Sequence, residues 1–229
     1  MLPAHRVWPL LSGQIQLTAE SQWGHSPAML DIAPLIRPHM SDDEIACYRR
    51  HLAKASSVVE FGVGGSTVLA AEMSVGTLHA IDSDPAWIDT VTKHPAVQRL
   101  IGEGRAVVLH ADIGPVGEWG KPADRRRRVS CADYARLPCP DPDLIFIDGR
   151  FRVACAIQAL LSTGSDTVIA IHDFWPKRSQ RWPARRYLAI WPFVRTIERA
   201  GTLGIFRRAP WFVKPLARLV LRHYRYDWR

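Results

Sequence analysis

The sequence predicts an α/β protein with a doubly wound, mostly parallel sheet in a single domain. Five short runs of apolar, often β-branched residues alternate with segments of helical pattern. The first run leads directly into a glycine-rich turn, and later runs end in Asp or His. Strands that are apolar on both faces and are joined by helices are typical of a parallel sheet covered on both sides.

The 229 residues are expected to divide into a proline-rich N-terminal arm over 1–40, a main domain over 41–206 and a basic C-terminal helix over 207–229. Ser41 and Glu44 have the spacing of a capping box, which predicts that a helix begins there. The predicted strands that follow are 57–61, 77–81, 105–110, 144–147 and 167–171, and the predicted helices are 67–73, 85–92, 152–161 and about 214–224.

Composition excludes several classes of protein. Hydrophobic residues make up 47% and charged residues 23%, which is typical of a globular domain and not of a disordered chain. No apolar run approaches the roughly 18 residues of a membrane span. The four cysteines lack metal-site spacing and do not form a disulfide framework, which favours a reducing, cytoplasmic location.

Charge is distributed unevenly along the chain. Residues 1–149 carry 14 basic and 18 acidic residues, whereas residues 150–229 carry 16 and 4. Such a basic segment favours an anionic partner. We expect a small anionic acceptor, held chiefly by Arg150, Arg152 and Lys177. These residues belong to an expected positive rim that also includes Arg178, Arg181, Arg185 and Arg186. A membrane surface and a second copy of the chain remain alternatives, and the absence of a known nucleic-acid motif disfavours nucleic acid.

The most informative stretch is the turn after the first predicted strand, Glu60-Phe61-Gly62-Val63-Gly64-Gly65-Ser66-Thr67. Glycines let the backbone turn sharply and approach a ligand closely. A dinucleotide-binding turn would have a third glycine where Thr67 stands, and the lysine-containing phosphate loop is absent. The acidic Glu60 favours a cationic amino group over a pyrophosphate. These features disfavour a nicotinamide-dependent oxidoreductase.

Asp82 ends the second predicted strand, where a carboxylate can accept hydrogen bonds from both hydroxyls of a ribose. The alternative is that Asp82 caps the next helix, although Asp84, directly before Pro85, is better placed for that role.

Together, Glu60-x-Gly62-x-Gly64-Gly65 and the strand-end acids Asp82 and Asp112 resemble the class I S-adenosylmethionine-dependent methyltransferases, over about residues 55–175. The stretches 112–120 and 146–154 resemble a bacterial subgroup of that family. The resemblance implies a Rossmann-like fold, S-adenosylmethionine as cofactor, and methyl transfer to oxygen or nitrogen of a small acceptor. A non-catalytic module that holds the cofactor and associates with a membrane or nucleic acid is the alternative.

The resemblance also implies which residues meet the cofactor. Glu60 would lie near the methionine amino group, Asp82 would hold the ribose, and Asp148 would close the methionine end. The remaining implied contacts are Gly62, Gly64, Gly65 and Ser66 at the turn, Ser83 after the second strand, and Asp112 and Ile113 at the adenine edge.

Candidate catalytic residues follow the last two predicted parallel strands: Asp148 and Arg150 after the first of them, and His172 and Asp173 after the second. Histidine is the usual general base near neutral pH, so His172 is the candidate for removing the acceptor's proton. The rival hypothesis is a magnesium ion held by Asp148 and Asp173, which is incomplete because Phe174 stands where a third oxygen ligand is expected.

Overall fold

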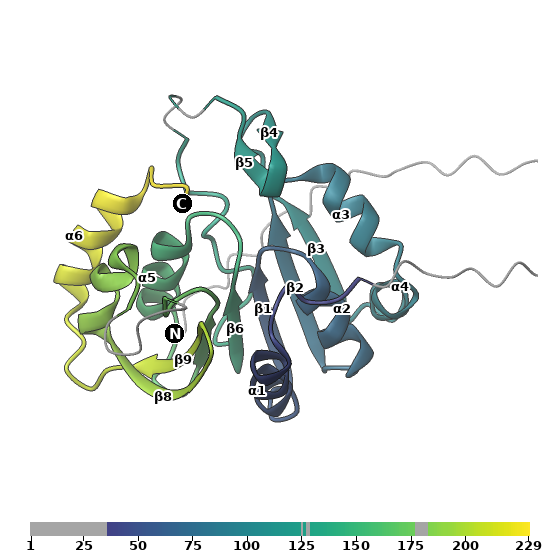
Figure 1. Cartoon of the computed structure of the whole chain (residues 1–229), viewed down its shortest axis with the longest axis horizontal. Helices are drawn as coiled ribbons and strands as arrows, with labels where there is room; N and C mark the ends of the chain where they lie inside the picture. Colours follow the sequence, from purple (N-terminus) through teal and green to yellow (C-terminus); the bar gives the residue numbers. More distant parts are fainter. Residues whose placement is uncertain (1–35, 125, 127–128, 177–182) are drawn as a thin grey trace, which may run out of the picture. The chain divides into compact units, whose positions relative to one another are not determined.

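A seven-stranded sheet with the order β3-β2-β1-β6-β7-β9-β8 forms the centre of the computed structural model (Figure 1). The five strands from β3 to β7 are parallel, and β9 and β8 are antiparallel additions at one edge, so the predicted fold class is confirmed. The structure describes residues 36–124, 126, 129–176 and 183–229, and most of the predicted N-terminal arm therefore lies outside the described residues.

The strands of the main sheet are β1 (Ser57–Phe61), β2 (Thr77–Asp82), β3 (Ala106–His110), β6 (Leu144–Ile147), β7 (Val168–Ile171), β8 (Val194–Ala200) and β9 (Leu203–Arg208). A small hairpin pairs β4 (Val116–Gly117) with β5 (Lys121–Pro122) around the short 3-10 helix η1 (Glu118–Gly120). The helices are α1 (Asp42–Leu52), α2 (Gly65–Glu72), α3 (Pro85–Thr92), α4 (Pro95–Gly102), α5 (Arg152–Ser162) and α6 (Lys214–Tyr224), with 3-10 turns η2 (Arg185–Ala189) and η3 (Trp191–Phe193).

Alternation along the strands buries both faces of the sheet, as the apolar runs predict. Val58 packs in a cluster with residues of α1, α2 and α4, and its neighbour Val59 packs in a second cluster with residues of α5. Figure 1 shows α5 and α6 on one side of the sheet and α2 and α4 on the other. The period of two along a strand makes this double burial possible.

Besides the small β4–β5 hairpin and the 3-10 turns, two larger parts of the fold were not predicted. The first is α4, which begins at Pro95 with the His94 side chain accepting a hydrogen bond from the Ala96 amide. The second is the β8–β9 hairpin, which has a register shift between Thr196 and Glu198. The outer strand of the hairpin is β8. Most side chains of β8 are exposed or half-buried and polar, so this strand lacks the apolar run that marks the inner strands.

The strand order reverses between β1 and β6, which are hydrogen-bonded neighbours although β2 and β3 separate them in the chain. Ligands of open α/β sheets bind beyond the carboxyl ends of the strands at such a reversal. The glycine-rich turn after β1 and the Asp148 loop after β6 meet at this place. A Cβ atom on Gly62 would collide with the backbone of Gly149, and Gly62 has a φ of +106°.

The C-terminal residues are part of the same packing. Helix α6 lies against α5, with Ala217 fully buried. Beyond the helix, the Phe151 amide donates to the Trp228 carbonyl at 3.1 Å, next to the loop after β6. In the described ranges, no helix has the length and apolar character needed to cross a membrane.

Candidate active site

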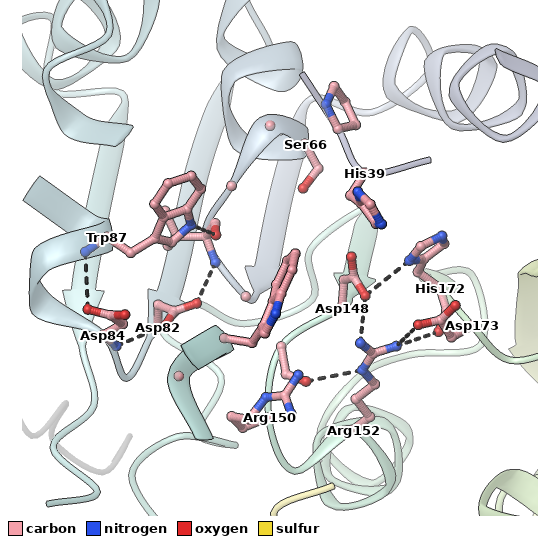
Figure 2. A pocket seen from close by; sticks show the side chains of 18 of the residues that line it. His39, Ser66, Asp82, Asp84, Trp87, Asp148, Arg150, Arg152, His172 and Asp173 are labelled. Atoms are coloured by element: carbon pink, nitrogen blue, oxygen red, sulfur yellow. Dashed lines mark hydrogen bonds and ion pairs between the residues drawn. The ribbon is translucent and has the colours of Figure 1, made fainter. Parts of the chain in front are cut away.

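A pocket of about 630 Å³ lies at the carboxyl ends of β1, β2, β6 and β7 (Figure 2). Ligand pockets in proteins usually measure about 300–1,000 Å³. Among its lining residues are most of those singled out from the sequence: Gly62, Gly64, Gly65, Ser66, Asp82, Asp148, Arg150, His172 and Asp173. The topology therefore brings together residues from four separate stretches of the chain.

The glycine-rich turn forms one wall of the pocket. The space beyond Gly64 is open, because an added Cβ would meet only the indole nitrogen of Trp87, at 3.9 Å. Gly65 has a different role, since a Cβ there would collide with the backbone of Arg37 and Pro38. Thr67 replaces a third glycine, and its hydroxyl accepts a hydrogen bond from the Gly64 amide at 2.8 Å. This contact explains why α2 begins at Gly65, two residues before the predicted start.

Asp82 connects the turns after β1 and β2. One carboxylate oxygen accepts from the Val63 amide at 2.9 Å, and the other accepts from the amides of Ser83 and Asp84 at 2.7 and 2.9 Å. Burial raises the pKa of Asp82, and the three N–H donors offset part of that effect. The helix cap is Asp84, as predicted, with its carboxylate accepting from Ala86 and Trp87.

Glu60 lies behind the pocket wall and not among the lining residues. It is fully buried, and the Ser66 hydroxyl donates to one of its carboxyl oxygens. The other oxygen has no hydrogen-bond partner among the described residues. Burial raises the pKa of Glu60 to about 8, so the carboxyl is mostly neutral at pH 7 without a ligand. This neutral state differs from the charged side chain expected from the sequence.

The buried carboxyl predicts a pH dependence of stability. Because the folded state binds the Glu60 proton more tightly than the unfolded state does, the free energy of unfolding should fall as pH rises from about 5 to 8. At about 1.4 kcal/mol per pKa unit, the fall is at most about 4 kcal/mol. Denaturant titrations across this range should show a shallower fall for Glu60→Gln. The exposed Glu72 on α2 supplies the matched control Glu72→Gln; equal slopes for all three proteins would contradict the prediction.

The opposite wall holds a cluster of charged groups from the loops after β6 and β7 (Figure 2). The Arg152 guanidinium lies 2.8 Å from the Asp148 carboxylate and 3.2 Å from that of Asp173. His172 places Nδ1 3.1 Å from Asp148 and Nε2 3.7 Å from Glu44 of α1. Burial lowers the pKa of His172, but the carboxylates of Asp148, Asp173 and Glu44 outweigh it and raise the pKa above its usual value. Asp148 has a lowered pKa despite its burial, because Arg152 and His172 stabilise its charge.

The two arginines of this loop have different environments, which corrects the expectation that both form a positive rim. Arg152 is 7% exposed and also donates to the carbonyls of Gly149 and His172. Its charge is therefore already neutralised. Arg150 lines the pocket, and its Nε is buried without a hydrogen-bond partner among the described residues. Lys177, Arg178 and Arg181, the other predicted rim residues, lie outside the described residues, whereas the exposed Arg185 and Arg186 do not line the pocket.

The same contacts bear on the magnesium hypothesis. Ligand atoms of Asp148, His172 and Asp173 lie within 4.8 Å of one another. However, the Arg152 guanidinium already bridges the two carboxylates and provides the positive charge that a metal ion would provide. These residues therefore do not fit a magnesium site while Arg152 is in place.

Besides Glu60, three residues expected at the cofactor do not line the pocket. Ser83 is buried, and its hydroxyl donates to the Gly120 carbonyl at 3.1 Å. Asp112 is exposed and accepts from the Gly114 amide at 2.8 Å, and Ile113 belongs to the core. The hairpin that follows them, with Glu118, Trp119, Gly120 and Lys121, forms that part of the wall instead.

Several aromatic residues that were not predicted as site residues also line the pocket. The Trp87 indole donates to the Val63 carbonyl at 2.7 Å and so ties α3 to the glycine-rich turn. The rings of His39 and Trp119 lie 5.8 Å apart, and both residues line the pocket. Trp119 stands in a stretch that the resemblance had marked, but a single sequence gives no sign that His39 meets it.

Comparisons with known proteins agree with the fold. No protein-family model and no curated protein matches the chain. Among solved structures, a methyltransferase-like protein from Silicibacter pomeroyi is 27% identical, with a TM-score of 0.68, over 84% of this chain and 98% of that one. A putative O-methyltransferase from Klebsiella pneumoniae is 18% identical, with a TM-score of 0.47, over 76% and 84%.

The first of these likenesses extends over nearly the whole of the Silicibacter pomeroyi protein and most of this chain. The chain therefore resembles the class I S-adenosylmethionine-dependent methyltransferases in its fold. Its own glycine-rich turn faces a pocket at the point where the strand order of the sheet reverses.

Proposed function

We propose that the protein transfers a methyl group from S-adenosylmethionine to oxygen or nitrogen of a small acceptor, which is anionic. The observation that supports this proposal is one continuous pocket with two chemically different ends. The glycine-rich turn, Asp82 and Trp87 form one end, and Asp148, Arg150, His172 and Asp173 form the other.

The first end suits the cofactor. Gly64 leaves open space for a ligand to approach the turn, and the Asp82 carboxylate at the end of β2 supports the proposed contact with a ribose. When bound, S-adenosylmethionine supplies a methyl group on a positively charged sulfur. The carboxylates of Asp82 and Asp84 line this end of the pocket, and negative charge there favours a cation.

The second end suits the acceptor. The Nε atom of the lining residue Arg150 is buried and has no hydrogen-bond partner in the described ranges, and Lys121 of the β5 hairpin is another lining cation. An arginine fork binds a planar carboxylate or a phosphate with two hydrogen bonds, which favours an acceptor of that charge.

The cellular location is proposed from the cysteines. The unpaired cysteines and the reducing environment that they indicate favour a cytoplasmic location.

Holding donor and acceptor in line provides most of the catalysis in such a displacement. The acceptor's lone pair forms the new bond to the methyl carbon as the carbon–sulfur bond breaks, and the acceptor's proton must pass to a base. His172 is the proposed base through Nδ1, which lies 3.1 Å from the Asp148 carboxylate, because Nε2 faces Glu44, which does not line the pocket. Asp173, whose side chain is 46% exposed, is the other carboxylate at this end that can contact the acceptor.

This role of His172 predicts a pH profile. Because the pKa of His172 is raised, the ring loses its proton, and so becomes a base, at a higher pH than an ordinary histidine does. Turnover should therefore rise with pH, with a midpoint above 6.5. His172→Gln should lower turnover by about a hundredfold and remove this rise, with the cofactor affinity preserved. If the pH profile persists in His172→Gln and disappears in Asp173→Asn, the base is Asp173.

Calorimetry with S-adenosylhomocysteine tests the proposed cofactor, and we expect a dissociation constant in the micromolar range, about −8 kcal/mol. Pairs of acceptors that differ only in charge, such as a carboxylic acid and its amide, then test the acceptor class with radiolabelled S-adenosylmethionine. No heat with S-adenosylhomocysteine together with binding of NADH would refute the proposed function. Equal rates for the charged and neutral acceptors would refute the anionic acceptor alone.

A further inference from the structure

The outer side of α6 has an unusual surface for a helix at the edge of a domain. Ala217 is buried, and Val220, Leu221 and Tyr224 also pack against the core, so this side of the helix faces α5. The other side exposes Leu216 (48%) and Leu219 (57%). Just before the helix, Trp211 and Val213 are 65% and 51% exposed. Four large apolar side chains thus lie open to solvent within one short stretch.

Positive charge lies beside these apolar residues. Lys214, Arg218 and Arg222 are all exposed, and their spacing of four places them along one side of α6. The sequence has no aspartate or glutamate between Glu198 and Asp227. We call the surface of Trp211, Val213, Leu216, Leu219, Lys214, Arg218 and Arg222 the docking patch.

We propose that the docking patch binds the anionic surface of a lipid bilayer. An interfacial helix buries apolar side chains at the boundary between headgroups and acyl chains, and its Lys and Arg side chains contact the anionic headgroups. Tryptophan is enriched at that boundary because its ring is apolar and its N–H is polar. The Trp211 indole donates to the Pro192 carbonyl of η3 at 3.0 Å, which holds its ring at the surface.

Two other possible occupants match the docking patch less well than a bilayer does. A second copy of the chain, docked through the same patch by twofold symmetry, would bring the same uncompensated cations face to face. Nucleic acid would satisfy the cations but would leave the aliphatic side chains of Val213, Leu216 and Leu219 without a partner. A bilayer with anionic headgroups satisfies both the cations and the apolar residues.

Point substitutions are the suitable test, because removing α6 would uncover α5 and break the hydrogen bond from Phe151 to Trp228. The full-length protein is sedimented with vesicles of phosphatidylcholine alone and with vesicles that also contain phosphatidylglycerol. We expect binding to the anionic vesicles only, weakening as salt increases. Leu216→Ser with Leu219→Ser should abolish this binding, and the melting temperature should change little because both side chains are exposed.

The charge variant is Arg218→Gln with Arg222→Gln. Each cation near an anionic membrane contributes about fivefold in affinity, so the double variant should bind about 25-fold more weakly. Its matched control is Arg49→Gln with Lys54→Gln, which removes two exposed cations at and beyond the end of α1 and should bind like the unaltered protein. S-adenosylhomocysteine binding should be the same in all variants, which separates this proposal from the proposed function.

Several results would overturn membrane docking. They are no sedimentation with either vesicle, equal binding to both vesicles, and an equal loss of binding in the α1 control. Analytical ultracentrifugation showing a dimer that Leu216→Ser with Leu219→Ser dissociates would assign the patch to a second copy. A gel shift with nucleic acid that depends on Arg218 and Arg222 but not on the leucines would assign it to nucleic acid.

Discussion

Arg152→Met is expected to lower the free energy of unfolding by about 1.5–3 kcal/mol, because the partly exposed carboxylates of Asp148 and Asp173 lose a charged hydrogen-bond donor. The Arg152 guanidinium lies between Asp148 and Asp173 and donates to two backbone carbonyls. Methionine fills a similar volume but provides no donor. Denaturant unfolding, followed by circular dichroism, measures the loss.

Arg150→Met is the matched control, since it makes the same change of charge and shape two residues earlier. The Nε atom of Arg150 has no hydrogen-bond partner among the described residues, so the loss of stability should stay below about 1 kcal/mol. Its effect should appear in a higher KM for the anionic acceptor. Equal losses of stability in the two variants would show that the Arg152 contacts do not hold the loop in place.

Asp82→Ala should have two effects. It should weaken S-adenosylhomocysteine binding by about 1.5–3 kcal/mol, the usual contribution of hydrogen bonds to a charged group. It should also lower stability by about 1–3 kcal/mol, because the amides of Val63, Ser83 and Asp84 lose their acceptor. Calorimetry measures the first effect and denaturant unfolding the second.

Asp143→Ala provides the control for Asp82. The Asp143 carboxylate accepts from the amides of Ser56 and Ser57 at 2.8 and 2.9 Å, at the opposite end of the strands. Its removal should lower stability and leave S-adenosylhomocysteine binding unchanged. Normal ligand binding by Asp82→Ala would refute a role for Asp82 at the ribose.

Local patterns were enough to predict the framework of the fold. Apolar runs located the five parallel strands to within one residue at each end, and the strand 144–147 is found as predicted. The capping box at Ser41 and the cap at Asp84 are also present, because both depend on residues within one helical turn. Residues that end parallel strands meet at one edge of the sheet, so the main lining residues of the pocket could also be predicted.

The environment of each charged side chain was decided only by the tertiary structure. Arg150 and Arg152 look alike in the sequence, yet Arg152 is buried between two carboxylates and Arg150 lines the pocket. Glu60 was expected to be charged, and its burial behind Ser66 keeps it mostly neutral. The exposed leucines of α6 likewise become visible only once α5 has covered the other side. Burial and pairing depend on neighbours distant in the chain, so a single sequence predicts the strands and caps but not these contacts.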